Sequence, residues 1–188
     1  MSHSPRVLQQ RPCGDKRLPV IVLIGGGSRS GKSRYALEYA RQKGRPLAFI
    51  ATAETRDDEM RLRVANHRRE RGDDFITIEE PLLLERALAE AVQRYRAIVV
   101  DCLTLWLSNL MLDDRPHDIG RETSSLLRTA AETEAAVLLV ANEVGCGIVP
   151  ENELARRFRD LAGAMNQQAG RAAAEIYWMA FGYPVRVK

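Results

Sequence analysis

The sequence of 188 residues has few of the side chains that hold a small scaffold together by metal ions or disulfides. Its three cysteines, Cys13, Cys102 and Cys146, are far apart, and no C-x-x-C pair or Cys/His cluster occurs. A structural zinc site therefore has no ligands at the usual spacing. Scattered single thiols are typical of a reducing compartment, so we expect a cytoplasmic protein.

Long hydrophobic segments are also missing. No apolar run approaches the roughly 18 residues that a membrane-spanning helix requires, so the sequence predicts no membrane span. Residues 1–18 have neither the apolar core of a secretory signal nor any periodicity. We interpret them as a flexible N-terminal extension, followed by a single domain at 19–188.

The chain has little excess charge outside this extension. The formal net charge is +3. Residues 1–18 carry Arg6, Arg11, Lys16 and Arg17 against Asp15, which accounts for the whole excess, and the rest of the chain is neutral. Proteins that bind nucleic acid normally have a basic body or stripe, and single-strand binders use stacking aromatics, whereas aromatics make up only 6% of this chain. We therefore expect no nucleic-acid partner.

Continuous apolar runs alternate with stretches of helical spacing. This pattern is typical of a parallel sheet covered on both faces, and predicts a single-domain, three-layer α/β fold. The predicted strands are 19–24, 46–52, 75–80, 97–101, 135–142, 175–180 and 184–188. The predicted helices are 33–42, 57–71, 81–95, 103–112, about 120–134 and 150–174, and those at 81 and 150 would begin with proline.

A glycine-rich loop follows the first predicted strand and precedes a helix. It satisfies the pattern G-x-x-x-x-G-K-[ST], in which backbone N–H groups and the helix N-terminus surround a phosphate chain. Lys32 would reach the β- and γ-phosphates, and the Ser33 hydroxyl would bind Mg²⁺. A structural glycine turn is the alternative. The predicted nucleotide-binding residues are Gly26, Gly27, Ser28, Arg29, Ser30, Gly31, Lys32 and Ser33.

Asp101 ends the apolar strand AIVVD. A carboxylate at this position can hold the Mg²⁺ shell of a P-loop enzyme, although many strands end in Asp simply as the chain turns. Ligands of parallel sheets bind at the carboxyl ends of the strands, which favours the functional interpretation. We expect Ser33 and Asp101 to contribute to a Mg²⁺ site through the phosphates.

The segment 61–71, RLRVANHRRER, has five arginines against one acid and contains His67. It could be an ordinary solvated cationic surface, but such crowding is unfavourable unless an anion offsets it, and a triphosphate would do so. Neighbouring positive charge should keep His67 neutral. A neutral imidazole is a nucleophile, so His67 could attack a phosphorus of the nucleotide.

Four blocks of the chain resemble the bifunctional adenosylcobinamide kinase / adenosylcobinamide-phosphate guanylyltransferase family of cobalamin biosynthesis. The phosphate loop lies in the first block, the arginine-rich segment in the second and Asp101 in the third, and the fourth carries NEVGCGIVPENELARRFRDLAGAMNQ. A P-loop alone is widespread, but these blocks in this order are specific. They are 26–37, 49–71, 100–111 and 142–167.

The resemblance implies a RecA-like P-loop NTPase fold and a two-step enzyme. Adenosylcobinamide would first be phosphorylated by ATP or GTP. GTP would then guanylylate His67, releasing pyrophosphate, and GMP would pass to the phosphorylated corrinoid to give adenosylcobinamide-GDP. Some family members have two adjacent histidines here, whereas residue 66 of this chain is Asn. The resemblance also implies a homo-oligomer, with trimers common in the family.

Further nucleotide contacts follow from the resemblance alone. The family's contact positions match Thr52, Ala53, Glu54, Arg68, Arg69, Glu70, Arg71, Glu79 and Asp101. The catalytic residues would be His67 and Lys32. Two other functions stay open from the sequence: a monofunctional P-loop small-molecule kinase, in which the arginines only clamp phosphate, and a P-loop module that binds nucleic acid.

Three other features have two interpretations each. Residues 142–150, with Gly145 and Gly147, could be a tight strand-to-helix turn or a loop that faces the corrinoid or the nucleotide. We expect His117 to lie at the surface and Trp106 to lie in the core or in a subunit interface. His3 belongs to the extension.

Overall fold

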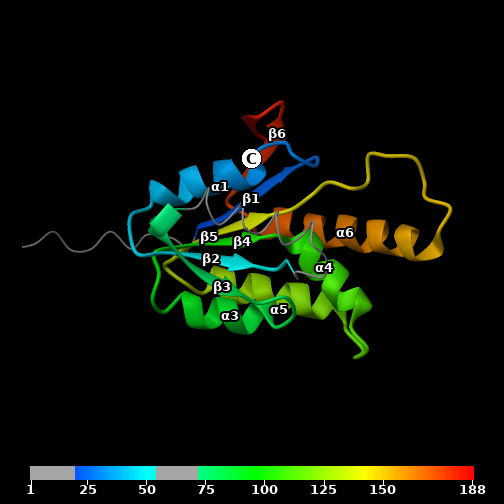
Figure 1. Ribbon diagram of the computed structural model, residues 1–188, viewed down its shortest axis with the longest axis horizontal. Helices are drawn as coiled ribbons and strands as arrows, with labels where there is room; N and C mark the ends of the chain where they lie inside the picture. Colours follow the sequence, from blue (N-terminus) through cyan, green and yellow to red (C-terminus); the bar gives the residue numbers. More distant parts are fainter. Residues whose placement is uncertain (1–19, 54–71) are drawn as a thin grey trace, which may run out of the picture.

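A computed structural model describes residues 20–53 and 72–188 of the chain, as a sheet covered by helices on both faces (Figure 1). The strands are β1 (Val20–Gly26), β2 (Leu47–Ala51), β3 (Phe75–Glu79), β4 (Ala97–Asp101), β5 (Ala136–Val140), β6 (Glu175–Ala180) and β7 (Tyr183–Arg186). The helices are α1 (Lys32–Arg41), α3 (Leu84–Ala91), α4 (Leu103–Leu112), α5 (Ile119–Ala131) and α6 (Glu153–Ala172), with a short 3₁₀ helix at Gly72–Asp74. The predicted extension and the predicted helix at 57–71 lie outside the described residues.

The strands form one sheet in the order β3-β2-β4-β5-β1-β6-β7. All neighbouring pairs are parallel except β6 and β7, which are antiparallel. The carboxyl ends of the parallel strands therefore meet at a single edge. This arrangement confirms the α/β fold with a mostly parallel central sheet that the apolar runs predict.

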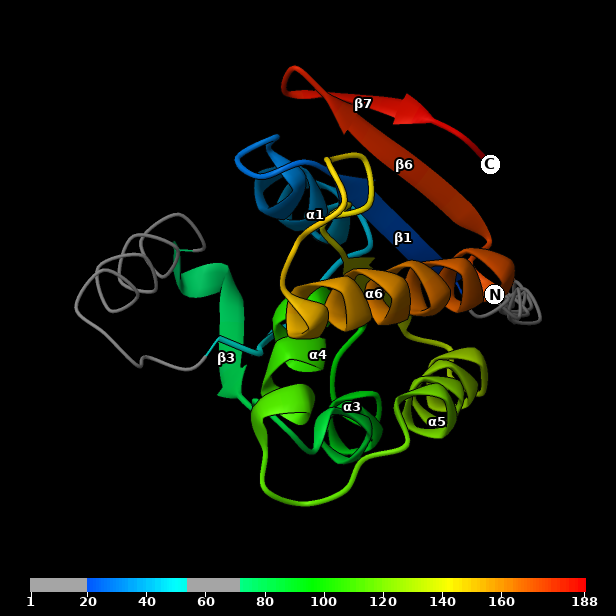
Figure 2. The ribbon, with the colours of Figure 1, turned by 90° about the vertical axis from the view of Figure 1, so that its right-hand side faces the viewer.

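Two layers of helices enclose the sheet. Figure 2 shows α1 on one face and α3, α5 and α6 on the other. Residues alternate between the faces, so that Ile21 and Leu23 of β1 belong to the cluster beneath α3 to α6, whereas Val22 and Ile24 pack with α1. Burial on both faces explains why the strands consist of consecutive apolar residues.

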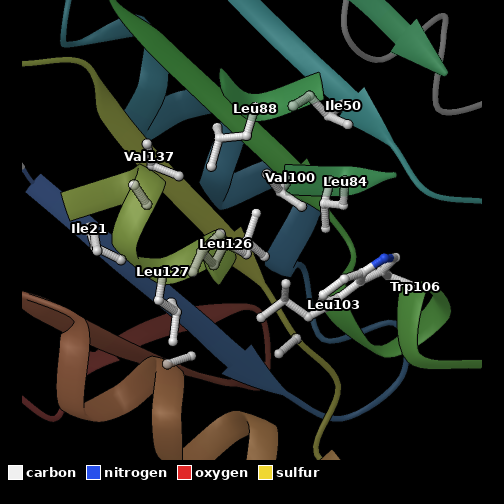
Figure 3. Close-up of a cluster of buried hydrophobic side chains, with 14 of the residues drawn as sticks. Ile21, Ile50, Leu84, Leu88, Val100, Leu103, Trp106, Leu126, Leu127 and Val137 are labelled. Atoms are coloured by element: carbon white, nitrogen blue, oxygen red, sulfur yellow. The ribbon is translucent and has the colours of Figure 1, made fainter. Parts of the chain in front are cut away.

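The larger cluster lies between the sheet and α3, α4, α5 and α6. In Figure 3, Leu126 and Leu127 of α5 lie close to Ile21 of the sheet. Trp106 of α4 is only 1% exposed, and its indole N–H donates to the Leu82 carbonyl oxygen at 2.9 Å. The core position expected for Trp106 is therefore confirmed.

The prediction that Pro81 begins a helix is wrong. Helix α3 begins three residues later, at Leu84. A carboxylate oxygen of Glu80 accepts hydrogen bonds from the backbone N–H groups of Leu82 and Leu83, at 2.9 and 2.8 Å. Because this side chain binds the free N–H groups in a turn, the chain enters the helix after that turn.

The start predicted at Pro150 is wrong for a similar reason. Helix α6 begins at Glu153, with Asn152 as its N-cap residue, because the Asn152 side chain accepts from the Ala155 N–H at 3.1 Å. Asparagine is among the best N-cap residues. The Pro150 carbonyl accepts instead from the Arg156 guanidinium at 3.0 Å, which fixes the preceding loop on the first turn of α6.

Candidate active site

The glycine-rich loop connects the carboxyl end of β1 to the N-terminus of α1. Three of its residues, Gly26, Arg29 and Gly31, have positive φ values of 142°, 55° and 93°. A Cβ atom at Gly26 would lie 3.0 Å from both the Met179 carbonyl oxygen and the Ser30 hydroxyl, so the loop has no space for a side chain there. The two glycines thus allow a tight turn that brings the loop over the first turn of α1.

Lys32 extends back into this loop. Its side chain is buried, with the residue 7% exposed, and its ammonium donates to the Gly27 carbonyl oxygen at 2.5 Å and to the Ser30 hydroxyl at 3.4 Å. The first turn of α1 contains no acidic residue. A positive ammonium and the positive end of a helix therefore lie together, which is the electrostatic requirement for binding a phosphate chain.

The predicted acidic residues lie along the same edge of the sheet. The strand register pairs Ala51 of β2 with Glu79 on one side and with Asp101 on the other. Thr52 and Ala53 follow directly after β2. Strand β4, which carries Asp101, is separated from β1 by β5 alone. The fold thus brings these residues and the phosphate loop to one edge of the sheet.

Thr52 is fully buried, and its polar groups are used within the protein. Its hydroxyl donates to the Cys102 carbonyl oxygen at 2.8 Å and accepts from the Cys102 N–H at 2.7 Å. Its N–H donates to the Asp101 carbonyl oxygen, and its carbonyl accepts from the Asn109 side chain. These bonds join the ends of β2 and β4 to α4. Thr52 therefore helps to hold the Asp101 backbone in place.

Asn109 was not among the candidates taken from the sequence. Its side-chain amide is buried and donates to the carbonyl oxygens of Thr52 and Pro81, at 2.8 and 3.1 Å. The available signal was a side-chain amide within the mainly apolar helix LTLWLSNLML. A buried amide needs partners, and here the partners are the backbone of the loops that follow β2 and β3.

Cys102 lies next to Asp101, but it is not suited to covalent chemistry. Burial raises the pKa of its thiol to about 12, and the neighbouring Asp101 carboxylate contributes to the rise. Its sulfur accepts a long hydrogen bond, 3.4 Å, from the Leu105 N–H at the start of α4. The thiol therefore stays protonated at neutral pH, because a thiolate is disfavoured in apolar surroundings.

His117 differs from the surface position expected for it. Its side chain is only 12% exposed and bridges two carboxylates, with Nε2 2.7 Å from Asp113 and Nδ1 2.8 Å from Glu122. The hydrogen bond to Asp113, followed by that to Glu122, raises the pKa of the imidazole above its usual value. The residue joins the segment after α4 to the first turn of α5. Along the chain, it lies far from the phosphate loop.

The other predicted site residues lie outside the described part of the chain. They are Glu54, His67, Arg68, Arg69, Glu70 and Arg71, which include the candidate nucleophile. The structure therefore brings together the phosphate loop, Thr52, Ala53, Glu79 and Asp101, and the arginine-rich segment stays a prediction from the sequence.

The donor set fits a Mg²⁺ ion held through phosphates. Ser33 is the second residue of α1 and Asp101 the last of β4, and both offer the oxygen ligands that Mg²⁺ prefers. Residues 20–53 and 72–188 contain no group of three or more His, Cys, Asp or Glu side chains that could hold a metal. Mg²⁺ generally binds few protein ligands and takes the rest from phosphates and water.

Sequence comparison decides the family. The profile described as cobinamide kinase / cobinamide phosphate guanyltransferase matches residues 22–187. The chain belongs to this family. As a member of the cobinamide kinase / cobinamide phosphate guanyltransferase family it is an enzyme, with a kinase and a transferase activity in the family's description.

Two bacterial relatives extend the match over almost their whole length. The chain is 42% identical over 166 residues to the bifunctional adenosylcobalamin biosynthesis protein CobP of Pseudomonas aeruginosa, covering 88% of this chain and 96% of that protein. It is 36% identical over 182 residues to the bifunctional adenosylcobalamin biosynthesis protein CobU of Escherichia coli, covering 90% and 100%.

Solved structures with little sequence identity share the fold of this family member. A RadB recombinase superimposes with a TM-score of 0.53 at 17% identity, covering 86% of this chain and 74% of that one. A second solved structure, an ATPase domain, gives 0.53 at 14% identity, covering 86% and 69%. These likenesses support the RecA-like P-loop fold alone. Among the described helices, none has the length and hydropathy of a membrane span.

Proposed function

We propose that this chain phosphorylates adenosylcobinamide with ATP or GTP, and then transfers GMP from GTP, through a guanylyl-histidine, to give adenosylcobinamide-GDP and pyrophosphate. One observation carries the proposal: a formed phosphate loop with its lysine folded into it, in a chain whose family description contains both activities. The relatives' names add cobalamin biosynthesis as the pathway.

In the kinase step, the described residues bind and orient the triphosphate. The loop amides and Lys32 would hold the β- and γ-phosphates, and Ser33 and Asp101 would hold Mg²⁺, which neutralises phosphate charge when bound. The corrinoid hydroxyl oxygen then forms a bond to the γ-phosphorus as the bond to the bridging oxygen breaks, so that ADP or GDP leaves and the hydroxyl proton is released to a phosphate oxygen or to water. Such in-line transfer depends on positioning and charge stabilisation rather than on a covalent intermediate.

In the transferase step, we assign His67 as the nucleophile. An imidazole nitrogen would bond to the α-phosphorus of GTP, and pyrophosphate would leave. A phosphate oxygen of the phosphorylated corrinoid would then displace the imidazole. The arginines of 61–71 support this role because guanidinium groups bind phosphate oxygens in pairs and keep a nearby imidazole neutral.

The surroundings of His117 support the same assignment by elimination. Both of its ring nitrogens face carboxylate oxygens at hydrogen-bond distance. Its raised pKa favours the imidazolium, which has no free electron pair for attack. Of the three histidines, His3 lies in the N-terminal segment, and His67 alone lies within an arginine-rich segment.

Labelling with α-³²P-GTP tests the intermediate. We expect a protein-bound label that is acid-labile and alkali-stable, and that is lost in His67→Asn. His117→Asn is the matched control, because it removes a histidine by the same substitution elsewhere and should retain the label. ATP labelled at the α-phosphate, tested in parallel, reports the base preference.

Two results would overturn the transferase half. One is a label that persists in His67→Asn, and the other is the absence of label from the wild-type protein under turnover conditions. A wild-type enzyme that phosphorylates adenosylcobinamide without becoming labelled would be the monofunctional kinase that the sequence leaves open.

Location and assembly belong to the same proposal. We propose a cytoplasmic enzyme with a small-molecule corrinoid substrate and no nucleic-acid partner, assembled as a homo-oligomer, with a trimer as the arrangement to test. The scattered thiols, the neutral body and the family resemblance support these expectations.

A further inference from the structure

A groove of about 610 Å³ lies between the loop that follows β5 and the outer face of α6. Its size is within the range of small-molecule binding sites. The loop contributes Gly145, Gly147 and Val149, and α6 contributes Arg159, Asp160, Gly163, Ala164, Gln167, Gln168 and Arg171. The helical residues recur every three or four positions and so form one face, about 18 Å long at 1.5 Å per residue.

Gly163 has no packing role in the described part of the chain. A Cβ atom at this position would meet nothing within 4 Å, and the same is true of Gly147 across the groove. Gly163 lies in the middle of the 20-residue helix α6, where glycine is markedly less favourable than alanine. By contrast, a Cβ at Gly170 would contact Ile176 at 3.6 Å. The backbone at Gly163 is therefore open to the groove.

Direct hydrogen bonds join the groove to the phosphate loop. The Glu143 N–H, at the start of the same loop, donates to the Gly26 carbonyl oxygen at 3.1 Å. The Asn166 side-chain amide, from α6, donates to the Asn142 carbonyl oxygen at 3.3 Å. Figures 1 and 2 show the connection leaving the sheet beside the phosphate loop and returning to α6. The loop that forms one side of the groove is therefore anchored both to the phosphate loop and to α6.

Asn166 lies at this junction but not among the residues that line the groove. Its side-chain oxygen is buried and has no hydrogen-bond donor among the described residues, although buried acceptors are normally paired. Its side-chain amide still fastens α6 to the loop.

The polar groups of the groove suit a ligand rich in amides, and Arg171 adds a positive charge to the lining. The Arg159 guanidinium lies 3.9 Å from the Asp160 carboxylate, which offsets its charge. Gln167 and Gln168 carry primary amides, which both donate and accept, and the Gln168 side-chain oxygen also accepts from the Ser124 hydroxyl at 3.5 Å. Corrinoids carry acetamide and propionamide arms around a broad ring, and the glycines leave the groove shallow enough for such a ring to approach the backbone.

We propose that this groove, between 145–149 and the α6 face around Gly163, binds the amide-bearing corrin ring of the acceptor substrate. The assignment rests on the proposed function, because it names the site of the corrinoid in that reaction. Gln167 and Gln168 pair with the amide arms, Gly163 and Gly147 contact the ring, and the hydroxyl-bearing arm extends toward Lys32 and Ser33.

Gly163→Leu and Gly163→Ala test the site. Both residues favour helix, so both variants should fold, and Gly163→Ala should raise Tm by about 2–4 °C. Equilibrium dialysis with adenosylcobinamide, followed by the visible absorption of the corrin, should give a Kd at least tenfold higher in Gly163→Leu and about threefold higher in Gly163→Ala. The KM for adenosylcobinamide should rise in parallel, with the KM for nucleotide within twofold.

The matched control is Arg157→Ala, an exposed residue of α6 outside the groove, which should bind the corrinoid as the wild type does. Unchanged corrinoid binding in Gly163→Leu would overturn the site and leave the proposed function intact. Failure of the wild type to bind or phosphorylate the corrinoid would overturn both. A loss of binding accompanied by a lower mass in light scattering would assign the groove to a second copy of the chain, and would also overturn it.

Discussion

The phosphate loop and the α6 groove are linked through the loop that follows β5 but are built in different ways. The loop is formed by consecutive residues, and its binding groups are backbone amides, a helix end and Lys32, which already donates to Gly27. The groove is formed by side chains and glycine backbone from a loop and a helix, with Asn142 and Asn166 fastening one to the other. The difference suggests that the loop fixes a constant part of the substrate, the phosphates, whereas the groove recognises the variable part.

Removing the lysine of the loop should have the largest effect. Lys32→Ala deletes the buried ammonium that would neutralise phosphate charge, and we expect kcat of the kinase step to fall by at least about 100-fold. A coupled assay of ADP release measures it. Lys43→Ala is the matched control, since Lys43 lies beyond the end of α1 over the Tyr39 ring. A fall of less than fivefold in Lys32→Ala would mean that the loop binds phosphate by backbone alone.

The hydrogen bonds around Thr52 test whether this edge of the sheet depends on contacts between residues that are far apart in the sequence. Thr52→Val keeps the shape but leaves the Cys102 N–H buried without its acceptor, whereas the Cys102 carbonyl still accepts from the Trp106 N–H; we expect a loss of about 1–3 kcal/mol in the free energy of unfolding. Urea denaturation measures this loss. Thr52→Ser restores the hydroxyl and should recover most of the stability. If Thr52→Val were as stable as the wild type, the bonds to Cys102 would not hold this edge together.

His117 lies in neither region and should have the smallest effect. Its pKa is raised in the folded protein, chiefly by Asp113 and then by Glu122, so its contribution to stability is complete below about pH 6.5 and is lost as pH rises through the folded pKa. Asp113 stays ionised throughout that range, because Arg115 and then His117 lower its pKa to about 2.

We therefore expect the Tm difference between the wild type and His117→Asn to be largest near pH 5.5 and to shrink by pH 8.5. Scanning calorimetry across this range provides the measurement. A difference that is constant with pH would mean that the imidazolium contributes nothing beyond packing. The kinase step should be unaffected at pH 7.

The contrast between the two regions also explains what the sequence could predict. The phosphate loop and the strands depend on neighbouring residues, so their positions were predicted within a few residues. The helix starts at Pro81 and Pro150 were wrong because neighbouring side chains, Glu80 and Asn152, take the free N–H groups instead. Proline at a first helical position is a local preference, and local preferences yield to better caps.

The contacts of Asn109 could not be predicted because its partners are far apart in the chain, and the α6 groove could not be predicted because it depends on how the preceding loop folds against the helix. Asn109 binds the carbonyls of Thr52 and Pro81, residues 57 and 28 positions away. The polar residue in an apolar helix was visible, but its partners depend on the sheet order. Similarly, the sequence offered residues 142–150 as either a turn or a ligand-facing loop, and only the fold places Gly147 opposite Gly163.

The position of β1 has a consequence for how the enzyme matures. This strand is the first described element, yet its neighbours on either side are β5 and β6, more than a hundred residues later. During synthesis, the phosphate loop therefore emerges long before the strands that support it, and such distant pairing is slow. Nucleotide affinity should appear only when the last strands have joined the sheet, and a bound triphosphate should then stabilise the completed fold over earlier intermediates.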